Sequence, residues 1–243
     1  MSGFLCFQLP HAASLAPTGR IFGYEIFPQY RDSAGAVVRA VNRGVETRRL
    51  ERIEKGRFYK PRNGALGEVP VSDEERLRDA LYRNGRRVGY VTGPALYNRL
   101  GLTTQVPKTV AIAVNRATQT KDLGTIRMKL LSRRAPISDS TVPLLEILDI
   151  LRDARRVPDA NVERVIQEMT KRMTELKPAE LKKLQRFALD YYNPATRALL
   201  GMLLTRCQKA VLPALKASLN PTTRFDLGID PDEWPESPAW NIR

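Results

Sequence analysis

The stretch Ser33–Pro61, SAGAVVRAVNRGVETRRLERIEKGRFYKP, determines how the N-terminal part of this chain folds. Its first half carries apolar residues at positions i, i+4 and i+8: Val37, Val41 and Val45. This spacing places them on one face of a helix. Ser33 is a residue type that favours the N-cap position. The pattern therefore predicts a helix that begins after Ser33 and ends near Thr47.

The second half of the stretch has the pattern of a hairpin. Leu50–Ile53 and Arg57–Lys60 are strand-like, and the segment EKG at 54–56 lies between them. Gly56 supplies the positive φ that a tight turn requires. We therefore expect the helix to lead directly into a two-stranded hairpin.

The chain has 243 residues, of which 42% are apolar, and a formal net charge of +14. This length suits one large or two small domains, and the positive surplus indicates a polyanionic partner. Two cysteines and one histidine are too few for a disulfide framework or a Cys/His zinc site. No apolar run approaches the ~18 residues of a membrane span, so we expect a cytoplasmic protein that does not contact the membrane.

The positive charge is concentrated in two segments. Residues 31–62 carry ten lysines and arginines against four acids, a net of +6, and residues 116–134 carry six against one, a net of +5. Residues 220–243 have the opposite sign, with two arginines against five acids, a net of −3. This asymmetry predicts a concentrated anion-binding surface.

A helix followed by a basic hairpin is typical of a winged helix-turn-helix, in which the helix enters the major groove of DNA. With the valine face toward the core, Arg39, Asn42 and Arg43 lie on the opposite face, and their side chains suit the edges of guanine and adenine. The cations of the hairpin suit phosphates. The residues expected to contact double-stranded DNA are Ser33, Arg39, Asn42, Arg43, Arg48, Arg49, Arg52, Lys55, Arg57 and Lys60. RNA is the weaker hypothesis, because Phe58 and Tyr59 alone make a poor stacking surface.

The rest of the chain alternates between strand and helix patterns and then becomes helical. Residues 62–71 are rich in glycine and proline and predict a linker. Ser72 and Thr92 are expected to cap helices. Strands are predicted over 88–91, 109–114 and 125–131, and helices from residue 142 onward. The tail is expected to be extended and to pack on the body through Trp234 and Trp240.

The expected fold class is therefore α+β, with an N-terminal winged helix-turn-helix followed by a mixed α/β region and a helical C-terminal part. We place the DNA-binding domain at 1–65 and a second domain at 66–243. Within the second domain, strands are expected over 66–140, mainly helices over 141–219, and an acidic extended tail over 220–243.

Two segments resemble the AbiEi-like antitoxins of bacterial type IV toxin–antitoxin systems. VNRGVETRRLERIEKGRFYKP, at 41–61, is similar to the winged-helix end of that family. TGPALYNRLGLTTQVP, at 92–107, is similar to a second family segment. The residues that carry this second match are Gly93, Ala95, Asn98, Leu100, Gly101, Leu102, Thr104, Gln105, Val106 and Pro107. The basic run RMKLLSRRAP at 127–136 also fits, so the resemblance covers about residues 20–137.

The resemblance implies a protein that represses its own operon by binding inverted repeats in the promoter, with two copies on the DNA. It also implies that the C-terminal domain counteracts a nucleotidyltransferase-like toxin. Three features depart from the family: Gly44 stands where leucine is usual, Arg48 stands where glycine is usual, and residues 1–19 lack a clear helix pattern. The helix-to-hairpin corner is therefore expected to be built differently here.

The segment 101–107 is expected to be a turn that positions the next strand. Pro107 favours an extended Val106, and Thr104 and Gln105 are expected to be buried and to satisfy backbone groups. The alternative is that this segment forms a surface for the toxin or for DNA.

No catalytic set was found, and we expect neither enzymatic activity nor a cofactor or metal. Asp149 and Asp153 have i, i+4 spacing that suits a hard cation, but the neighbouring Arg152 favours a surface ion-pair network instead. Two other functions remain open. One is a winged-helix regulator without a toxin partner, and the other is a basic protein–protein module that does not bind DNA.

Overall fold

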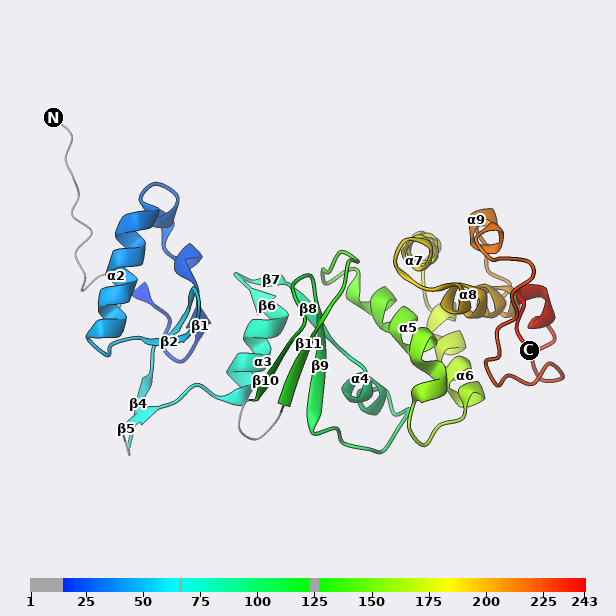
Figure 1. Ribbon diagram of the computed structural model, residues 1–243, viewed down its shortest axis with the longest axis horizontal. Helices are drawn as coiled ribbons and strands as arrows, with labels where there is room; N and C mark the ends of the chain where they lie inside the picture. The colour runs from blue at the N-terminus through cyan, green and yellow to red at the C-terminus, as the bar shows by residue number, and fades with distance from the viewer. Residues whose placement is uncertain (1–14, 66, 123–126) are drawn as a thin grey trace. The chain divides into compact units, whose positions relative to one another are not determined.

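The structure is a computed structural model of the chain and describes residues 15–65, 67–122 and 127–243. The fold is mixed α+β, as expected (Figure 1). The chain divides into two compact units, with the boundary between Arg86 and Arg87. The part before this boundary is called unit 1, and the described part after it is called unit 2. The sequence placed this boundary after residue 65, and the helix that follows the predicted linker belongs instead with unit 1.

Over its described residues from Ile21 on, unit 1 contains short strands, two 3-10 turns and two helices. Their bounds are β1 Ile21–Phe22, η1 Tyr24–Ile26, η2 Pro28–Tyr30, α2 Ala34–Glu46, β2 Glu51–Glu54, β3 Arg57–Tyr59, β4 Arg62–Gly64, β5 Gly67–Val69, α3 Asp73–Leu81, β6 Tyr82–Arg83 and β7 Arg86–Arg87. The first three strands form an antiparallel sheet in the order β1-β3-β2, and β4 pairs with β5. The predicted helix and hairpin are confirmed, and Gly56 has a φ of 72° at the turn. The predicted linker is wrong, because 62–64 and 67–69 are exposed strands that pair with each other.

The core of unit 1 lies between α2 and the sheet. Val37 and Val41 are fully buried there beside Phe58 of β3. Gly44 also faces inward, and a Cβ at this position would lie 2.8 Å from Leu50 Cδ1. The absence of a side chain at Gly44 therefore leaves the space that Leu50 fills.

Unit 2 begins with a sheet and ends with a group of helices. Its elements are β8 Gly89–Thr92, α4 Pro94–Arg99, β9 Thr109–Val114, β10 Gln119–Asp122, β11 Arg127–Ser132, α5 Val142–Asp153, η3 Ala154–Arg156, α6 Val162–Thr174, α7 Pro178–Tyr191, α8 Pro194–Arg206, α9 Pro213–Ala217 and η4 Pro238–Trp240. The strand order is β10-β11-β9-β8, with β9 and β11 parallel and the other pairs antiparallel. The edge strand β10 was not predicted, because its sequence QTKD is entirely polar.

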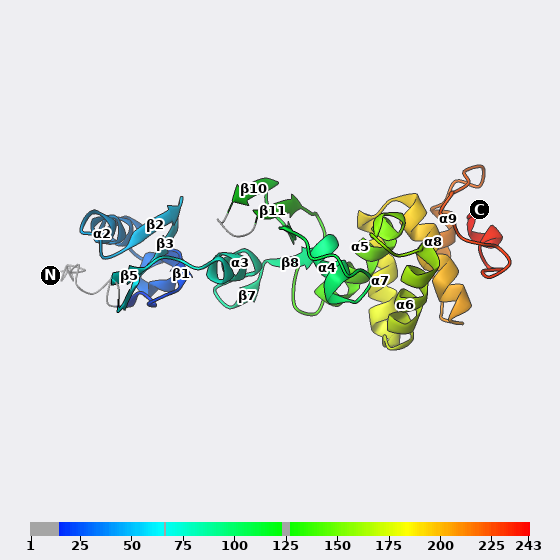
Figure 2. The same ribbon diagram turned by 90° about the horizontal axis from the view of Figure 1, so that it is seen from below.

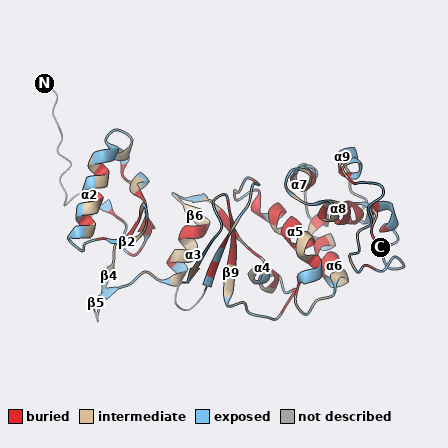
Figure 3. Ribbon diagram, in the orientation of Figure 1, coloured by how far each residue is buried: buried red, intermediate tan, exposed pale blue. Residues whose placement is uncertain are grey.

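The helices α5, α6, α7 and α9 of unit 2 pack against α8, whose middle, Ala198–Leu204, is buried throughout (Figures 2 and 3). The tail packs on this group as expected, since Trp234 and Trp240 are both buried. The Trp240 indole donates to Thr205 Oγ1 at 3.0 Å, and its ring covers Gly201 so closely that a Cβ there would lie 2.2 Å from a ring carbon. Among the described residues, no helix has both the length and the apolar content needed to cross a bilayer.

Candidate nucleic-acid interface

The outer face of α2 carries the residues expected to contact bases. Arg39 and Arg43, one helical turn apart, are both exposed. Asn42 lies between them and is half-buried, and its Oδ1 accepts a hydrogen bond of 2.9 Å from Arg52 Nη2. Arg52 also lies 5.7 Å from the centre of the Phe58 ring. The hairpin residue Arg52 therefore fixes the Asn42 side chain. Arg39 and Arg43 form no ion pair with any described residue.

The corner between α2 and β2 adds two more exposed cations, Arg48 and Arg49, and Lys55 is exposed at the hairpin tip. Arg48 has a φ of 55°, in the left-handed region. An L-residue in this conformation costs about 1–2 kcal/mol.

The structure places Arg57 elsewhere than the sequence predicted. Its side chain is only 8% exposed, and its guanidinium binds Glu25 Oε1 at 2.9 Å and the Asp79 carboxylate of α3. Arg57 is therefore not available to phosphates. The sequence placed it beside Lys55 at the turn, but Glu25 and Asp79, 32 and 22 residues away in the sequence, bind its guanidinium on the buried side of β3.

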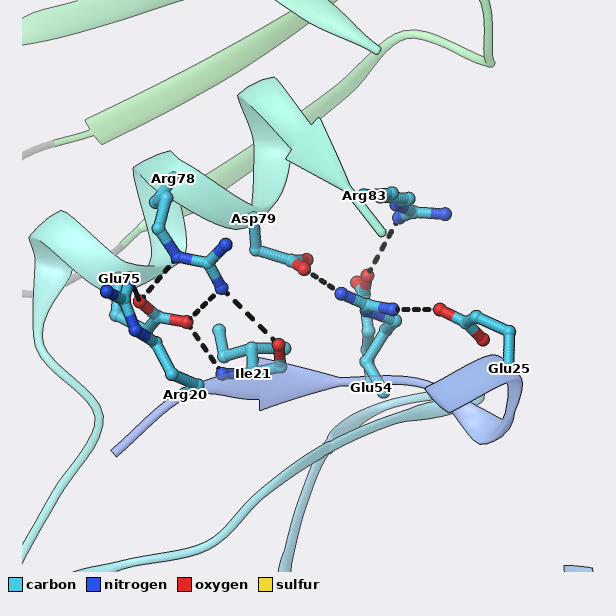
Figure 4. A network of polar contacts seen from close by, with 9 residues as sticks. Arg20, Ile21, Glu25, Glu54, Glu75, Arg78, Asp79 and Arg83 are labelled. Atoms are coloured by element: carbon cyan, nitrogen blue, oxygen red, sulfur yellow. Dashed lines mark hydrogen bonds and ion pairs between the residues drawn. The ribbon is translucent and has the colours of Figure 1, made fainter. Parts of the chain in front are cut away.

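Two acids of α3 hold this helix to the sheet of unit 1 (Figure 4). Asp79 is the first, and Glu75 is the second. The Ile21 amide donates to Glu75 Oε1 at 2.6 Å, Arg20 Nη1 to Oε2 at 3.2 Å, and Arg78 Nε to Oε2 at 2.7 Å. Burial alone raises the pKa of Glu75, but the bonds from Arg78, Ile21 and Arg20 outweigh it and hold the pKa below its usual value.

Local sequence patterns could not show this role of α3. Ser72 does cap the helix as predicted, since its Oγ accepts from the Glu75 amide at 3.2 Å. The partners of Asp79 and Glu75 lie on strands far away in the sequence. The burial of Glu75 and Asp79, which only the structure shows, is what identifies this role.

The charges of unit 1 are thus sorted into two sets. The arginines near α3 are paired with acids: Arg20, Arg57, Arg78 and Arg83. The cations of α2 and the hairpin form no ion pair within the part of the chain that the structure describes: Arg39, Arg43, Arg48, Arg49 and Lys55. Unpaired cations on one face create a positive potential toward a polyanion.

The remaining two predicted contacts lie at the margins of this face. Ser33 is exposed at the N-cap of α2, but its side chain makes no capping hydrogen bond. Lys60 is half-buried after β3, and its backbone carbonyl accepts from the Gly19 amide at 2.8 Å.

The family-like segment 92–107 lies in unit 2. Gly93 and Gly101 have φ values of 65° and 70° at the two ends of α4, which glycine allows. Gly93, and not Thr92, is the N-cap of α4. Asn98 Nδ2 donates to the Thr103 carbonyl at 3.3 Å, which closes the loop after the helix. The other residues of the match are Ala95, which is half-buried, Leu102, which is buried, and Pro107, which is half-buried.

The expected burial of Thr104 and Gln105 is wrong. Both are exposed, and Val106 beside them is 83% exposed. Thr103 takes the buried position instead, and its Oγ1 accepts from the Gln105 amide at 3.1 Å. The loop therefore presents a Thr-Gln-Val tip to its surroundings, held from within by Thr103.

The expected surface network around Asp149 is buried instead. Asp149 is fully buried and accepts hydrogen bonds from Thr92 Oγ1 at 2.6 Å, Arg152 Nη1 at 2.7 Å, Tyr192 at 2.9 Å and Tyr90 at 3.0 Å. Arg152 balances the charge of this carboxylate, and the four donors together satisfy its hydrogen-bonding capacity. In the described ranges, no group of histidine, cysteine and acidic residues is arranged to hold a metal ion.

The structure is thus a two-unit α+β protein whose N-terminal unit carries exposed cations without ion pairs, among the described residues, on α2, at the α2–β2 corner and at the hairpin tip. The chain belongs to the family described as "Family of unknown function (DUF6088)", which it matches over residues 11–136. No curated protein matches it. A solved structure described as RV2827C protein from Mycobacterium tuberculosis is 15% identical, with a TM-score of 0.44, and the match covers 89% of this chain and 81% of that one. This similarity is too low to carry an argument.

Proposed function

We propose that unit 1 is a winged helix-turn-helix that binds double-stranded DNA, with α2 as the recognition helix and the β2–β3 hairpin as the wing. The order of its elements supports this: η1 and η2 precede α2, the hairpin follows α2 directly, and β1 pairs with β3 to close the sheet. In this arrangement two short 3-10 turns stand where a helix-turn-helix usually has its first helix.

The observation that carries the proposal is the set of unpaired cations on the face of α2 and the hairpin. Acids are available in unit 1, yet they pair with Arg57 and with the arginines beside α3. The cations of α2, the corner and the hairpin tip are left without an acid partner among the described residues, so they remain available to an external anion. A polyanion gains contacts there, because each phosphate contact also releases a counterion.

The positions within this face suggest different roles. Arg39 and Arg43 project from the exposed side of α2 and suit bidentate contacts with guanine. Arg48, Arg49 and Lys55 lie at the corner and at the wing tip, where contacts with phosphates fix the register but do not select a sequence. We therefore expect sequence preference to come from α2 and general affinity from the corner and the wing.

A binding assay with labelled duplexes separates these roles. One duplex comes from the region upstream of the protein's own gene, and the other is a scrambled duplex of equal length. Arg43→Gln should weaken binding to the first by about 1–3 kcal/mol and to the second much less. Lys55→Gln should weaken both equally, and the matched Lys182→Gln, on an exposed residue of α7, should change neither. Equal effects of Lys55→Gln and Lys182→Gln would place the interface elsewhere or exclude DNA as the partner.

Arg48 offers a second test. Its strained backbone lowers the stability of the fold, whereas its charge is expected to raise the affinity for DNA. Arg48→Gly removes the left-handed penalty of about 1–2 kcal/mol, partly offset by the greater freedom of glycine in the unfolded chain. We expect the free energy of unfolding to stay level or rise while DNA affinity falls. A variant that is less stable and binds DNA as well as the wild type would contradict both the strain and the contact.

We further propose, on the resemblance to AbiEi-like antitoxins, that the DNA is an inverted repeat in the protein's own promoter, bound by two copies. On the same ground, the chain counteracts a nucleotidyltransferase-like toxin. The exposed tip at 104–106 supports a protein contact, because Val106 is apolar and 83% exposed. Co-expression with a toxin encoded by the adjacent gene should relieve growth arrest, and Val106→Asp should reduce this relief without altering DNA binding. No adjacent toxin gene, or equal relief by the variant, would favour a regulator without a toxin partner.

A further inference from the structure

Unit 2 contains a pocket that the proposed DNA interface does not use. It lies where β11 ends and where α7 gives way to α8, and it has a volume of about 460 Å³. This volume falls within the range of small-molecule sites, about 300–1,000 Å³. Cationic and aromatic side chains from three separate parts of unit 2 line it: Arg133, Arg134, Arg152, Tyr191 and Tyr192.

The arginines of the pocket are not equivalent. Arg152 is already neutralised, because its guanidinium binds Asp149 Oδ1 and Asp153 Oδ2, each at 2.7 Å. Arg133 and Arg134 form no ion pair within the described residues. The pocket therefore presents two free positive charges above a floor that is already balanced.

Arg133 is also incompletely satisfied. Its Nη1 donates to the Ser132 carbonyl at 3.1 Å, but its Nε is buried and has no hydrogen-bond partner in the described part of the chain. A phosphate accepts hydrogen bonds from arginine especially well, and the remaining guanidinium N–H groups of Arg133 and Arg134 suit such an anion.

A lone phosphate would leave most of the pocket empty, so the other lining residues indicate what accompanies it. Tyr191 is 40% exposed, and its ring is held by an edge contact with Phe187, with the ring centres 5.8 Å apart. A fixed, exposed aromatic ring offers a stacking surface for a planar base. Asp190, the one acid among the lining residues, offers a carboxylate that can accept hydrogen bonds from sugar hydroxyls.

The floor of the pocket is rigid. The Tyr192 hydroxyl donates to the buried Asp149 at 2.9 Å, and the Arg152 guanidinium lies 5.9 Å from the centre of the Tyr192 ring. These contacts fix one wall before any ligand binds, which reduces the entropy that binding costs.

We propose that this pocket binds a free nucleotide, with its phosphate on Arg133 and Arg134, its base against Tyr191 and its sugar near Asp190. The proposal does not rest on DNA binding by unit 1. It assigns to unit 2 a small-ligand site, through which a cellular nucleotide would be sensed.

Calorimetric titration of the full chain tests this, with AMP, GMP, adenosine and inorganic phosphate as probes. We expect at least one nucleotide to bind more tightly than either phosphate or adenosine alone. Arg133→Gln and Arg134→Gln should each weaken it about tenfold or more, and Tyr191→Ala by about fivefold or more. The matched Arg186→Gln, on an exposed arginine of α7 outside the pocket, should leave the affinity unchanged.

Thermal unfolding followed by tryptophan fluorescence confirms that each variant is folded before titration. Three results would overturn the proposal. The first is no saturable nucleotide binding up to about 10 mM. The second is nucleotide binding that none of the pocket variants weakens more than Arg186→Gln does. The third is equal or tighter binding of phosphate alone, or of a short single-stranded oligonucleotide, which would assign the pocket to another anion.

Discussion

Removal of the Asp79 carboxylate should destabilise unit 1 by about 2–4 kcal/mol. Asp79 and Arg57 form an ion pair whose side chains are 9% and 8% exposed. The loss of one partner from a buried pair typically costs about 3–5 kcal/mol, because the other charge is left without compensation. Arg57 keeps Glu25 at 2.9 Å, but that carboxylate is 36% exposed, so it offsets only part of the loss.

A surface pair provides the matched comparison. Glu168 and Arg172 of α6 lie 3.1 Å apart at i, i+4 spacing, with side chains 30% and 38% exposed. Glu168→Ala should therefore cost only about 0.3–0.5 kcal/mol. Replacement of both buried partners, as Arg57→Met with Asp79→Leu, should recover much of the stability that Asp79→Ala loses, because no buried charge then remains unpaired.

Urea denaturation and amide hydrogen exchange provide the measurement. Trp234 and Trp240 are the only two tryptophans of the chain and both belong to unit 2, so tryptophan fluorescence follows unit 2 alone. Asp79→Ala should accelerate exchange over β1–β3 and lower the stability seen by circular dichroism, while the tryptophan transition stays in place. If Asp79→Ala costs no more than Glu168→Ala, the buried pair does not hold α3 to the sheet and our reasoning about unit 1 is wrong.

Three further outcomes are expected. Gly44→Ala should destabilise unit 1 by about 1–2 kcal/mol, because the new methyl group would lie 2.8 Å from Leu50 Cδ1. Gly201→Ala should displace the Trp240 ring, which a Cβ would approach to 2.2 Å, and should shift tryptophan emission to longer wavelength. Below about pH 4.3, the unfolded pKa of glutamate, unit 1 should lose stability, because Glu75 has a depressed pKa in the fold and loses its bonds on protonation.

Each of these has its own control. Gly35, exposed in the first turn of α2, would place a Cβ no closer than 3.5 Å to Arg39, so Gly35→Ala should leave stability level or raise it by about 0.5 kcal/mol. Thr205→Val removes the partner of the Trp240 indole without crowding the ring, so it should shift the emission less than Gly201→Ala. Glu75→Gln should weaken the fall in the free energy of unfolding of unit 1 at acid pH. An unchanged pH dependence in that variant would show that other groups control this fall.

Local sequence patterns correctly predicted the elements that are determined by interactions between residues close together in the sequence. The valine spacing and Gly56 predicted α2 and the hairpin, and apolar periodicity predicted the helices from α5 onward. The patterns failed where pairing over a distance decides the structure. The strands β4, β5 and β10 have no apolar alternation, so only their partners define them.

The same limit applies to the candidate sites. The free cations of α2 were visible from spacing alone, but the burial of Arg57 was not, because its partners Asp79 and Glu25 lie 22 and 32 residues away in the sequence. The nucleotide pocket could not be foreseen either. Arg133 and Arg134 belong to a recognised basic run, yet the tyrosines beside them come from the junction of α7 and α8, far along the sequence.

The salt dependence of DNA binding tests the central proposal most directly. If Arg48, Arg49 and Lys55 each neutralise one phosphate, the logarithm of the association constant should fall against the logarithm of salt concentration with a slope of about −2.7 per bound copy, that is about 0.9 for each of three contacts. Lys55→Gln should reduce the slope by about 0.9, and Lys182→Gln should leave it unchanged. A slope near zero, or one that Lys55→Gln does not alter, would contradict DNA binding through the face of α2 and the hairpin.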